Sequence, residues 1–383
     1  MEPMSDVKGL LMQQLEGLFT PTDASICLAH IEDRFLRRYL PGARATEPCA
    51  ICGRLRKATG LDDVLAFGVE MIRLYRGRAL DDLSYDSEEE YGFAFTYAVS
   101  HTWDIVPALF EGGLDDDLLQ LMQERLEPDI WYERSMIWLE GKELYLYSWR
   151  QFAEAMRTGV TPERDDWATE AAEGISVEEM LERLASLIDE FDLVHPSSRA
   201  RWIRAVRVPK SDALDAARLG TAPPEHAMDG RMSCRGEGIF YGAADEQTSL
   251  LEIRAVAEES EIVVGEWRPR RPLHLLDLTR LPTLPSFYDL ERKYQRDMLT
   301  FLEAFATDVS LPVDVPTLGG YRPTQAISAH LRQSFEGLDG IVYSSSITGK
   351  ACCALFVSNK ECGDETGPLE FRKFHRRRSV RGA

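Results

Sequence analysis

Long hydrophobic runs are absent from this chain of 383 residues. Because a membrane-spanning helix needs about 20 consecutive apolar residues, this absence excludes a membrane protein. The first residues mix acidic and polar side chains into an apolar pattern, which predicts an amphipathic helix and not a secretory signal peptide. We therefore expect a cytoplasmic protein.

Positive charge is scarce. The chain has 44 Lys and Arg against 64 Asp and Glu, which gives a formal net charge of −20 at pH 7. Such a field repels polyanions, so general nucleic-acid binding is disfavoured. An anionic small ligand can still bind where arginines gather, which makes the positions of the arginines informative.

Three common catalytic signatures are also missing. The chain has neither a G-x-G-x-x-G run opening a βαβ unit nor a G-x-x-x-x-G-K-[ST] loop, which disfavours dinucleotide redox chemistry and P-loop chemistry. Some small helical domains are ribonucleases built on an Arg that stands four to six residues before a His. The histidines of the first half, His30, His101 and His195, have no Arg at that spacing, so such a centre is disfavoured.

Cysteine is infrequent, and its spacing indicates metal binding. Seven cysteines, an odd number in a reducing compartment, argue against a disulfide framework. Cys27 and His30 form one pair with two residues between its members, and Cys49 and Cys52 form another. A tetrahedral zinc ion takes four such ligands, so we predict a closed structural zinc knuckle at about residues 26–55. The alternative is a set of buried thiols with a surface histidine.

Helical patterns dominate the first half. Apolar residues recur at helical spacing over 61–75 and 118–126, and Ser176 opens a capping box before the periodic run 180–191. The segment 140–149 (EGKELYLYSW) reads as a short strand or a buried turn. His195 and Pro196 break the helical pattern, so we expect a helical domain over 1–195 and a second domain over 196–383.

The second half alternates short β-type runs with helical patterns, which predicts a mixed α+β domain. The expected strands are 202–208, 239–243, 261–267, 273–278, 340–343 and 354–358, and the expected helices are 211–219, 248–257, 286–305 and 324–334. The predicted fold class of the whole chain is therefore α+β.

Several polar residues of this half stand where chemistry is possible. Two arginines lie in the first strand, and a third follows Gly230 in a loop of small residues. A tyrosine lies in the strand 239–243, a glutamate lies in the helix after it, and a run of serines follows the strand 340–343. Each has an ordinary structural alternative: a solvated strand, an exposed helix face or a turn. The candidates are Arg204, Arg207, Arg231, Tyr241, Glu252, Ser344, Ser345 and Ser346.

Taken in order, short motifs of the second half resemble the RES domain. The motifs are 230–232 (GRM), 239–243 (IFYGA), 248–252 (TSLLE), 276–279 (LDLT), 321–325 (YRPTQ), 339–346 (DGIVYSSS) and 355–356 (LF). That family contains NAD-degrading toxins of bacterial toxin–antitoxin systems, with a fold similar to that of ADP-ribosyltransferases. The first half is similar to the helical zinc-knuckle extension that accompanies some RES domains.

The resemblance implies roles for the candidates, with NAD as the substrate. Glu252 would stabilise the positive charge that develops on the ribose, and Arg231, with Arg204 or Arg207, would neutralise the diphosphate. Tyr241 would stack on or hydrogen-bond the nicotinamide riboside. Ser345, or Ser346 if the register differs by one, would hold the ribose or the nicotinamide amide.

The residues leave several alternatives open. The acceptor of the ADP-ribosyl group can be water, phosphate or a macromolecule, which corresponds to a glycohydrolase, a phosphorylase or a transferase. A zinc-braced interaction or nucleic-acid-binding protein with an inactive RES-like half is a further alternative, suggested by the basic tail from Arg372 to Arg378 and by Arg381. The resemblance implies a helix-turn-helix-type antitoxin, while self-inhibition by the first domain stays open. Residues 281–320 could form a lid or a partner surface, and the sequence does not decide between these two roles.

Overall fold

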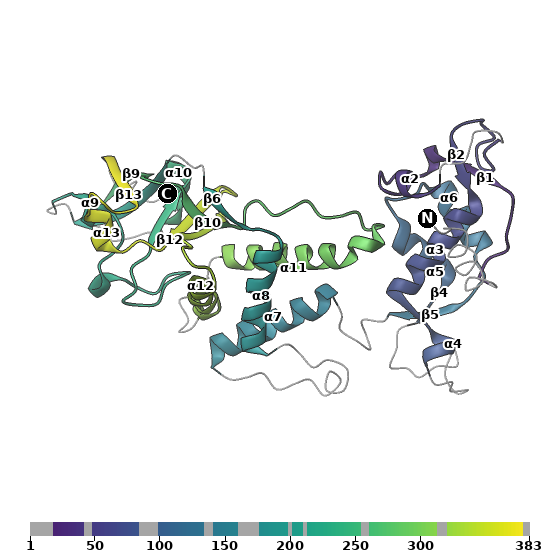
Figure 1. Ribbon diagram of the computed structural model, residues 1–383, viewed down its shortest axis with the longest axis horizontal. Coiled ribbons are helices and arrows are strands. Elements are labelled where there is room, and N and C mark those ends of the chain that lie inside the picture. Colours follow the sequence, from purple (N-terminus) through teal and green to yellow (C-terminus); the bar gives the residue numbers. More distant parts are fainter. Residues whose placement is uncertain are drawn as a thin grey trace, which may run out of the picture. The chain divides into compact units, whose positions relative to one another are not determined.

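The computed structural model describes residues 18–41, 48–83, 99–133, 141–159, 176–197, 201–209, 213–253, 260–311 and 320–377. The chain forms two compact units (Figure 1). Unit 1 comprises Met1–Glu140 with Pro285–Lys293, and unit 2 comprises Gly141–Leu284 with Tyr294–Ala383. In the described part of the chain, no helix is long and apolar enough to cross a membrane.

Unit 1 packs short helices around one apolar core. The main helix, α3, buries residues spaced by three and four along one face, as its sequence pattern predicts. Tyr288 of the later segment stacks on Phe110 with ring centroids 5.8 Å apart. The elements are β1 (Ser25–Cys27), η1 (Leu28–His30), α2 (Leu36–Tyr39), β2 (Ala58–Gly60), α3 (Leu61–Tyr75), β3 (Arg76–Arg78), α4 (Ala79–Asp82), β4 (Val99–His101), α5 (Thr102–Phe110), α6 (Asp116–Arg125), β5 (Ile130–Glu133) and η5 (Leu290–Arg292).

Unit 2 is built on an eight-stranded sheet in the order β13-β9-β7-β8-β12-β11-β10-β6. The β10–β11 pair is parallel, and the other neighbours are antiparallel. The strands are β6 (Val194–Ser197), β7 (Trp202–Pro209), β8 (Phe240–Ala243), β9 (Ser260–Pro269), β10 (Leu273–Asp277), β11 (Gly340–Ser344), β12 (Ala351–Leu355) and β13 (Leu369–Arg377). The expected α+β class, a helical first part followed by a mixed α/β part, is confirmed.

The two faces of this sheet have separate cores because side chains alternate along each strand. One face, which we call the Tyr343 face, packs against α7 (Gly141–Thr158), α8 (Val177–Glu190), α11 (Lys293–Ser310) and α12 (Arg322–Ser334). The other, the Trp202 face, packs against α9 (Ala216–Leu219) and α13 (Asn359–Gly363). The remaining elements are η4 (Pro224–His226) and α10 (Glu246–Glu252).

The segment 140–149 is not the predicted strand or buried turn, because its described residues, 141–149, form the first half of helix α7. Tyr145, Trp149 and Phe152 recur at helical spacing and are buried against the Tyr343 face. The helix begins at Gly141, whose φ is +51° and where a Cβ atom would meet Oδ2 of Asp297 at 2.5 Å. Glycine is therefore required where α7 approaches α11.

The compact units do not divide at residue 195. His195 lies in β6, which pairs with β10 as the edge of the large sheet, and α7 and α8 pack in the same unit. The segment from Arg372 that the sequence presents as a basic tail is part of edge strand β13 up to Arg377. Arg378 and Arg381 lie outside the described residues.

Candidate active site

Tyr241 and Tyr343 come from strands on either side of β12. Tyr241 pairs with Ala354, and Tyr343 pairs with Cys352. Because Cys352 and Ala354 are two residues apart, their partners point to the same face of the sheet. Ser345 follows Tyr343 by two residues just beyond the end of β11, so the chain carries a serine to the same side of the sheet.

Glu252 and Ser345 are brought together across 93 residues of sequence. Oγ of Ser345 donates a hydrogen bond to Oε1 of Glu252 at 2.6 Å, and Ser345 is 2% exposed. The same Oγ accepts the N–H groups of Ile347 at 3.2 Å and Thr348 at 3.3 Å. The backbone N–H groups of the turn therefore orient the Ser345 hydroxyl, and this hydroxyl orients the carboxylate of Glu252.

Helix α10 holds Glu252 in position at its last residue. Its N-cap Asp245 accepts the N–H of Thr248 at 2.9 Å, and this bond lowers the pKa of Asp245. The hydroxyls of Thr248 and Thr348 lie 3.1 Å apart, which joins the helix to the serine turn. Ser249 Oγ accepts the N–H of Ala205 on β7 at 2.7 Å.

Arg231 reaches the same cluster from its loop. Its Nη1 donates to the carbonyls of Val309 at 2.8 Å and Leu311 at 2.6 Å, and its guanidinium lies 5.4 Å from the ring centroid of Tyr343. The loop is fixed by the hydroxyl of Tyr241, which accepts the N–H of Met232 at 2.9 Å. These partners are neutral, so the positive charge of Arg231 is not cancelled by them.

Tyr343 lies at the centre of these groups. Burial raises its pKa well above the ordinary value, and it is close enough to Arg231, Tyr241 and Glu252 for their charges to act on it. Burial, with the nearby charge of Glu252, also raises the pKa of Cys352 to about 12. The Tyr343 face therefore brings an arginine, a tyrosine, a glutamate and a serine together around the buried side chain of Tyr343.

Arg204 and Arg207 point to opposite faces of the sheet. Arg204 lies on the Trp202 face, where it donates to the carbonyls of Gly220 at 2.9 Å and Tyr241 at 2.7 Å. Its burial lowers its pKa. Arg207 lies on the side of α10, and its Nη2 donates to the carbonyl of Ile253, the residue after Glu252, at 3.4 Å. The structure brings Arg207 near the cluster and keeps Arg204 away from it.

Two cavities adjoin the cluster, and both are large enough for parts of a small-molecule ligand. The serine cavity, about 580 Å³, is lined by Leu278, Thr279, Leu281, Glu303, Ala306, Thr307, Ser310, Leu311, Ser344, Ser345 and Ser346. The arginine cavity, about 430 Å³, is lined by Trp149, Arg157, Arg231, Asp308, Val309, Leu311, Gly320, Tyr321, Pro323 and Thr324. Leu311 borders both cavities, and its carbonyl accepts a hydrogen bond from Arg231.

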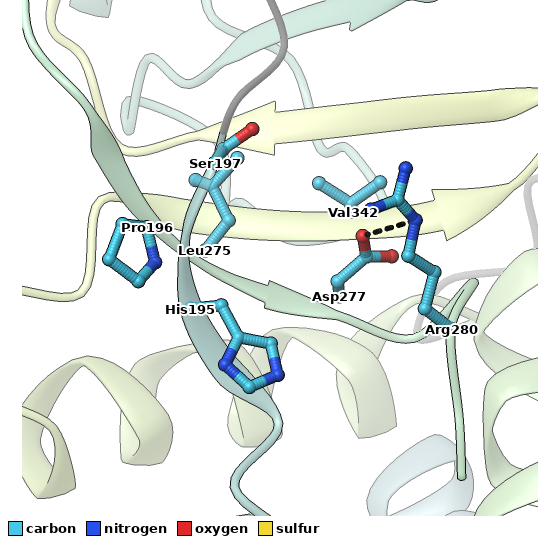
Figure 2. Close-up of a pocket in the computed structure, with 7 residues that line it drawn as sticks. All are labelled: His195, Pro196, Ser197, Leu275, Asp277, Arg280 and Val342. Carbon is cyan, nitrogen blue, oxygen red and sulfur yellow. Dashed lines mark ion pairs between the residues drawn. The ribbon is translucent and has the colours of Figure 1, made fainter.

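A third cavity, of about 300 Å³, opens on the opposite side of the sheet (Figure 2). Its wall includes Leu275 and Val342, which belong to the core of the Trp202 face. Asp277 and Arg280 form an ion pair of 3.7 Å within it. It contains none of the predicted site residues and is separate from the cluster.

In unit 1, the four predicted metal ligands converge. One ligand atom from each of Cys27, His30, Cys49 and Cys52 lies within 4.8 Å of every other, so the group could hold a metal ion. Strand β1 and η1 supply the first pair, and a tight turn before Gly53, whose φ is +67°, supplies the second. The N–H of Arg54 lowers the pKa of Cys52 to about 6, which favours the thiolate that metals bind.

His30 passes a further test as a ligand. Its Nδ1 lies 2.6 Å from Oδ2 of Asp115, and its Nε2 is buried without a hydrogen-bond partner among the described residues. A buried unpartnered nitrogen costs free energy unless a ligand such as a cation meets it. A carboxylate on the far ring nitrogen is the usual support of a metal-binding histidine. The residues present therefore fit a four-coordinate metal ion.

Fold and site together define a mixed α+β domain with an Arg–Tyr–Glu–Ser cluster on one sheet face. Residues 202–372 match the RES domain, and residues 43–159 match HEPN/RES N-terminal domain 1. The chain is therefore a RES-domain protein with the N-terminal domain that accompanies RES domains. All four residues of the cluster lie in the RES match.

This chain is similar to a solved structure, that of the M. tuberculosis MbcT–MbcA toxin–antitoxin complex. The similarity has a TM-score of 0.31 and 15% sequence identity, and it covers 51% of this chain and 93% of that one. No curated protein is significantly similar to this chain.

Sequence reasoning missed Tyr343 and Thr348 as parts of the site. Tyr343 was visible only as a member of a strand, yet its spacing of two from Ser345 places both on one side. Thr348 gives no sequence signal, because its partner Thr248 lies 100 residues away. Alternation within a strand could have found the first residue but not the second.

The burial of Cys352 predicts an unreactive thiol. With a pKa of about 12, only about one molecule in 10⁴ carries the thiolate at pH 8. We expect iodoacetamide to modify the exposed Cys234 of the native protein and to leave Cys352 intact until the chain is unfolded. Peptide mass spectrometry after timed alkylation measures both sites. Equal modification of the two cysteines in the folded protein would contradict the packing of the Tyr343 face.

Proposed function

We propose that the protein degrades NAD by cleaving the bond between nicotinamide and ribose, as a toxin-like enzyme. The observation that carries this proposal is the 2.6 Å hydrogen bond from the buried Ser345 to Glu252, within a cluster that also holds Arg231 and Tyr241. The membership of residues 202–372 in the RES domain supports it.

The cluster suits the charges of this reaction. Loss of nicotinamide leaves an oxocarbenium-like ribose, and a fixed carboxylate stabilises that positive charge. Oε1 of Glu252 accepts the Ser345 hydroxyl, and among the described residues Oε2 has no partner, so it is available to the ribose. Arg231 would pair with the diphosphate, Tyr241 would contact the nicotinamide riboside, and Ser345 and Ser346 would border the ribose in the serine cavity.

In this proposal Arg207, and not Arg204, acts with Arg231 in neutralising the diphosphate. It lies beside the end of α10, whereas the side chain of Arg204 lies on the other face of the sheet. We therefore assign the support of the diphosphate side to Arg231 and Arg207 and a structural role to Arg204.

The acceptor is water or phosphate in this proposal, because the basic segment is compensated locally. Arg372 pairs with Glu370 at 2.6 Å, Lys373 with Glu266 at 3.6 Å, and His375 faces Glu246 at 3.1 Å. Basic side chains that already face anionic partners, as these three do, offer little net positive charge to a nucleic acid. This favours free NAD over a macromolecular acceptor.

The cysteine and histidine cluster of unit 1 is proposed to hold zinc. Three thiols and an imidazole form a typical ligand set for a structural zinc ion, and a four-ligand site has no open position for catalysis. The ion would brace β1, η1 and the turn at Gly53. Inhibition of the enzyme by a helix-turn-helix-type antitoxin, or by the chain's own first domain, remains part of the proposal, because uncontrolled loss of NAD would harm the cell.

The reaction is tested by following NAD with the purified protein. We expect NAD to disappear and nicotinamide to appear in chromatographic time courses. A rate that depends on added phosphate identifies a phosphorylase, and an independent rate identifies a glycohydrolase. Intact NAD in both buffers overturns the proposed reaction.

The role of Glu252 is tested by Glu252→Gln, which keeps the hydrogen bond but removes the charge. We expect kcat to fall about 10²–10³-fold, since charge stabilisation in the transition state is lost. Glu246→Gln on the same helix is the control and should keep kcat within about twofold. Circular dichroism checks that both variants are folded. A Glu252→Gln enzyme with the kcat of the control would remove Glu252 from the mechanism.

If the cluster of Cys27, His30, Cys49 and Cys52 holds zinc, we expect plasma mass spectrometry to find one zinc ion per chain. Cys49→Ser should lose the zinc and lower the thermal unfolding temperature by at least about 5 °C, because metal binding contributes to folding free energy. Cys234→Ser, an exposed cysteine outside the cluster, should change neither value. Zinc retained at full occupancy in Cys49→Ser would exclude this ligand set.

A further inference from the structure

Helix α7 lies in the N-terminal family match by sequence but in unit 2 by packing. That match ends at residue 159, and the helix packs against α8 and α12 of unit 2. The indole Nε1 of its Trp149 donates to Oδ2 of Asp308 on α11 at 2.6 Å. A helix from outside the RES match is thus fixed to the RES domain.

The last turns of α7 form one wall of the arginine cavity. Arg157 and Arg231 line this cavity together, from elements more than seventy residues apart. Tyr321 and Thr324, at the start of α12, line it from another side. The RES match supplies Arg231 and the start of α12, but Arg157 comes from the N-terminal match.

The charges of this cavity favour an anion. Asp308 is the one carboxylate among its described lining residues, and one of its oxygens is bound to the indole of Trp149. Arg157 is exposed and forms no ion pair with any described residue, and the partners of Arg231 are carbonyls and a ring. Two uncompensated guanidinium groups on one cavity are suited to phosphate groups.

The position of the cavity indicates which part of a dinucleotide it would take. The serine cavity contains Ser345, the partner of Glu252, and shares with the arginine cavity the lining residue Leu311, whose carbonyl accepts a hydrogen bond from Arg231. A substrate with its reacting ribose at Glu252 and its nearer phosphate at Arg231 would continue into the arginine cavity. The more distant phosphate and the adenosine would then lie toward α7.

We propose that α7 is part of the substrate site and that Arg157 binds the adenylate phosphate of NAD, while Arg231 binds the phosphate on the nicotinamide side. This inference rests on the proposed function and adds to it a specificity residue from outside the RES domain. Arg157 is a binding residue with no part in bond cleavage, so it acts on KM and not on kcat.

Nicotinamide mononucleotide tests the assignment, since it keeps the scissile bond and the nearer phosphate but lacks the adenylate. We expect Arg157→Ala to raise KM for NAD about tenfold, with kcat within twofold, and to leave the kinetics with the mononucleotide unchanged. Arg231→Ala should weaken both substrates. Arg150→Ala is the matched control, because Arg150 is exposed on the same helix and lines a neighbouring cavity of about 320 Å³ with Arg157, but does not line the arginine cavity. It therefore controls for the loss of a positive charge close to Arg157.

A binding measurement separates this inference from the proposed reaction. Titration calorimetry with ADP-ribose should show about tenfold weaker binding for Arg157→Ala than for Arg150→Ala, whether or not NAD is cleaved. If NAD is cleaved but Arg157→Ala matches Arg150→Ala in KM and in ADP-ribose affinity, the inference fails and the reaction stands. If NAD stays intact while Arg157→Ala weakens ADP-ribose binding, the reaction fails and the cavity assignment stands. An equal loss of the mononucleotide and NAD reactions in Arg157→Ala also overturns the assignment.

Discussion

The hydrogen bond between Ser345 and Glu252 is the interaction on which the site depends. It connects the end of α10 with the turn after β11, and at 2.6 Å it has the length of a charge-assisted bond. The backbone N–H groups of Ile347 and Thr348 point at the same Ser345 oxygen, so the serine has little freedom to turn away. The carboxylate is consequently oriented before a substrate arrives, which is the condition for electrostatic catalysis without reorganisation.

The same site shows how a chain of net charge −20 can attract an anion. Some exposed cations have acidic partners, as Arg372 and Lys373 do on β13. Arg231 instead has carbonyl and aromatic partners, which hold the guanidinium in place without cancelling its charge. Because its charge is not cancelled by these partners, Arg231 contributes positive potential to the Tyr343 face of the sheet.

The sequence predicted which segments of the second half form strands, but it predicted the ends of the helices and strands less well. Each of the six expected strands has a counterpart in the sheet, because short β-branched and aromatic runs suit a half-buried strand. The alternation of Leu and Tyr over 144–147 imitates a strand, but the burial of Tyr145, Trp149 and Phe152 against α11 decides for a helix. Arg204 and Arg207 were treated as equivalent although they stand three positions apart, and a strand places residues so spaced on opposite faces. Contacts such as Thr248 with Thr348 depend on the tertiary fold alone.

Segments exchanged between the units explain why the compact units do not divide at residue 195. The segment Pro285–Lys293 packs in unit 1, and α7 and α8 pack in unit 2. A chain cut at 195 would expose the core contacts that Trp149, Leu184 and Ile188 make with the Tyr343 face, and it would remove one wall of the arginine cavity. Loss of that much buried apolar surface would destabilise the sheet that carries Glu252 and Ser345. The RES domain of this chain therefore includes, as a physical unit, helices that precede the residues of its family match.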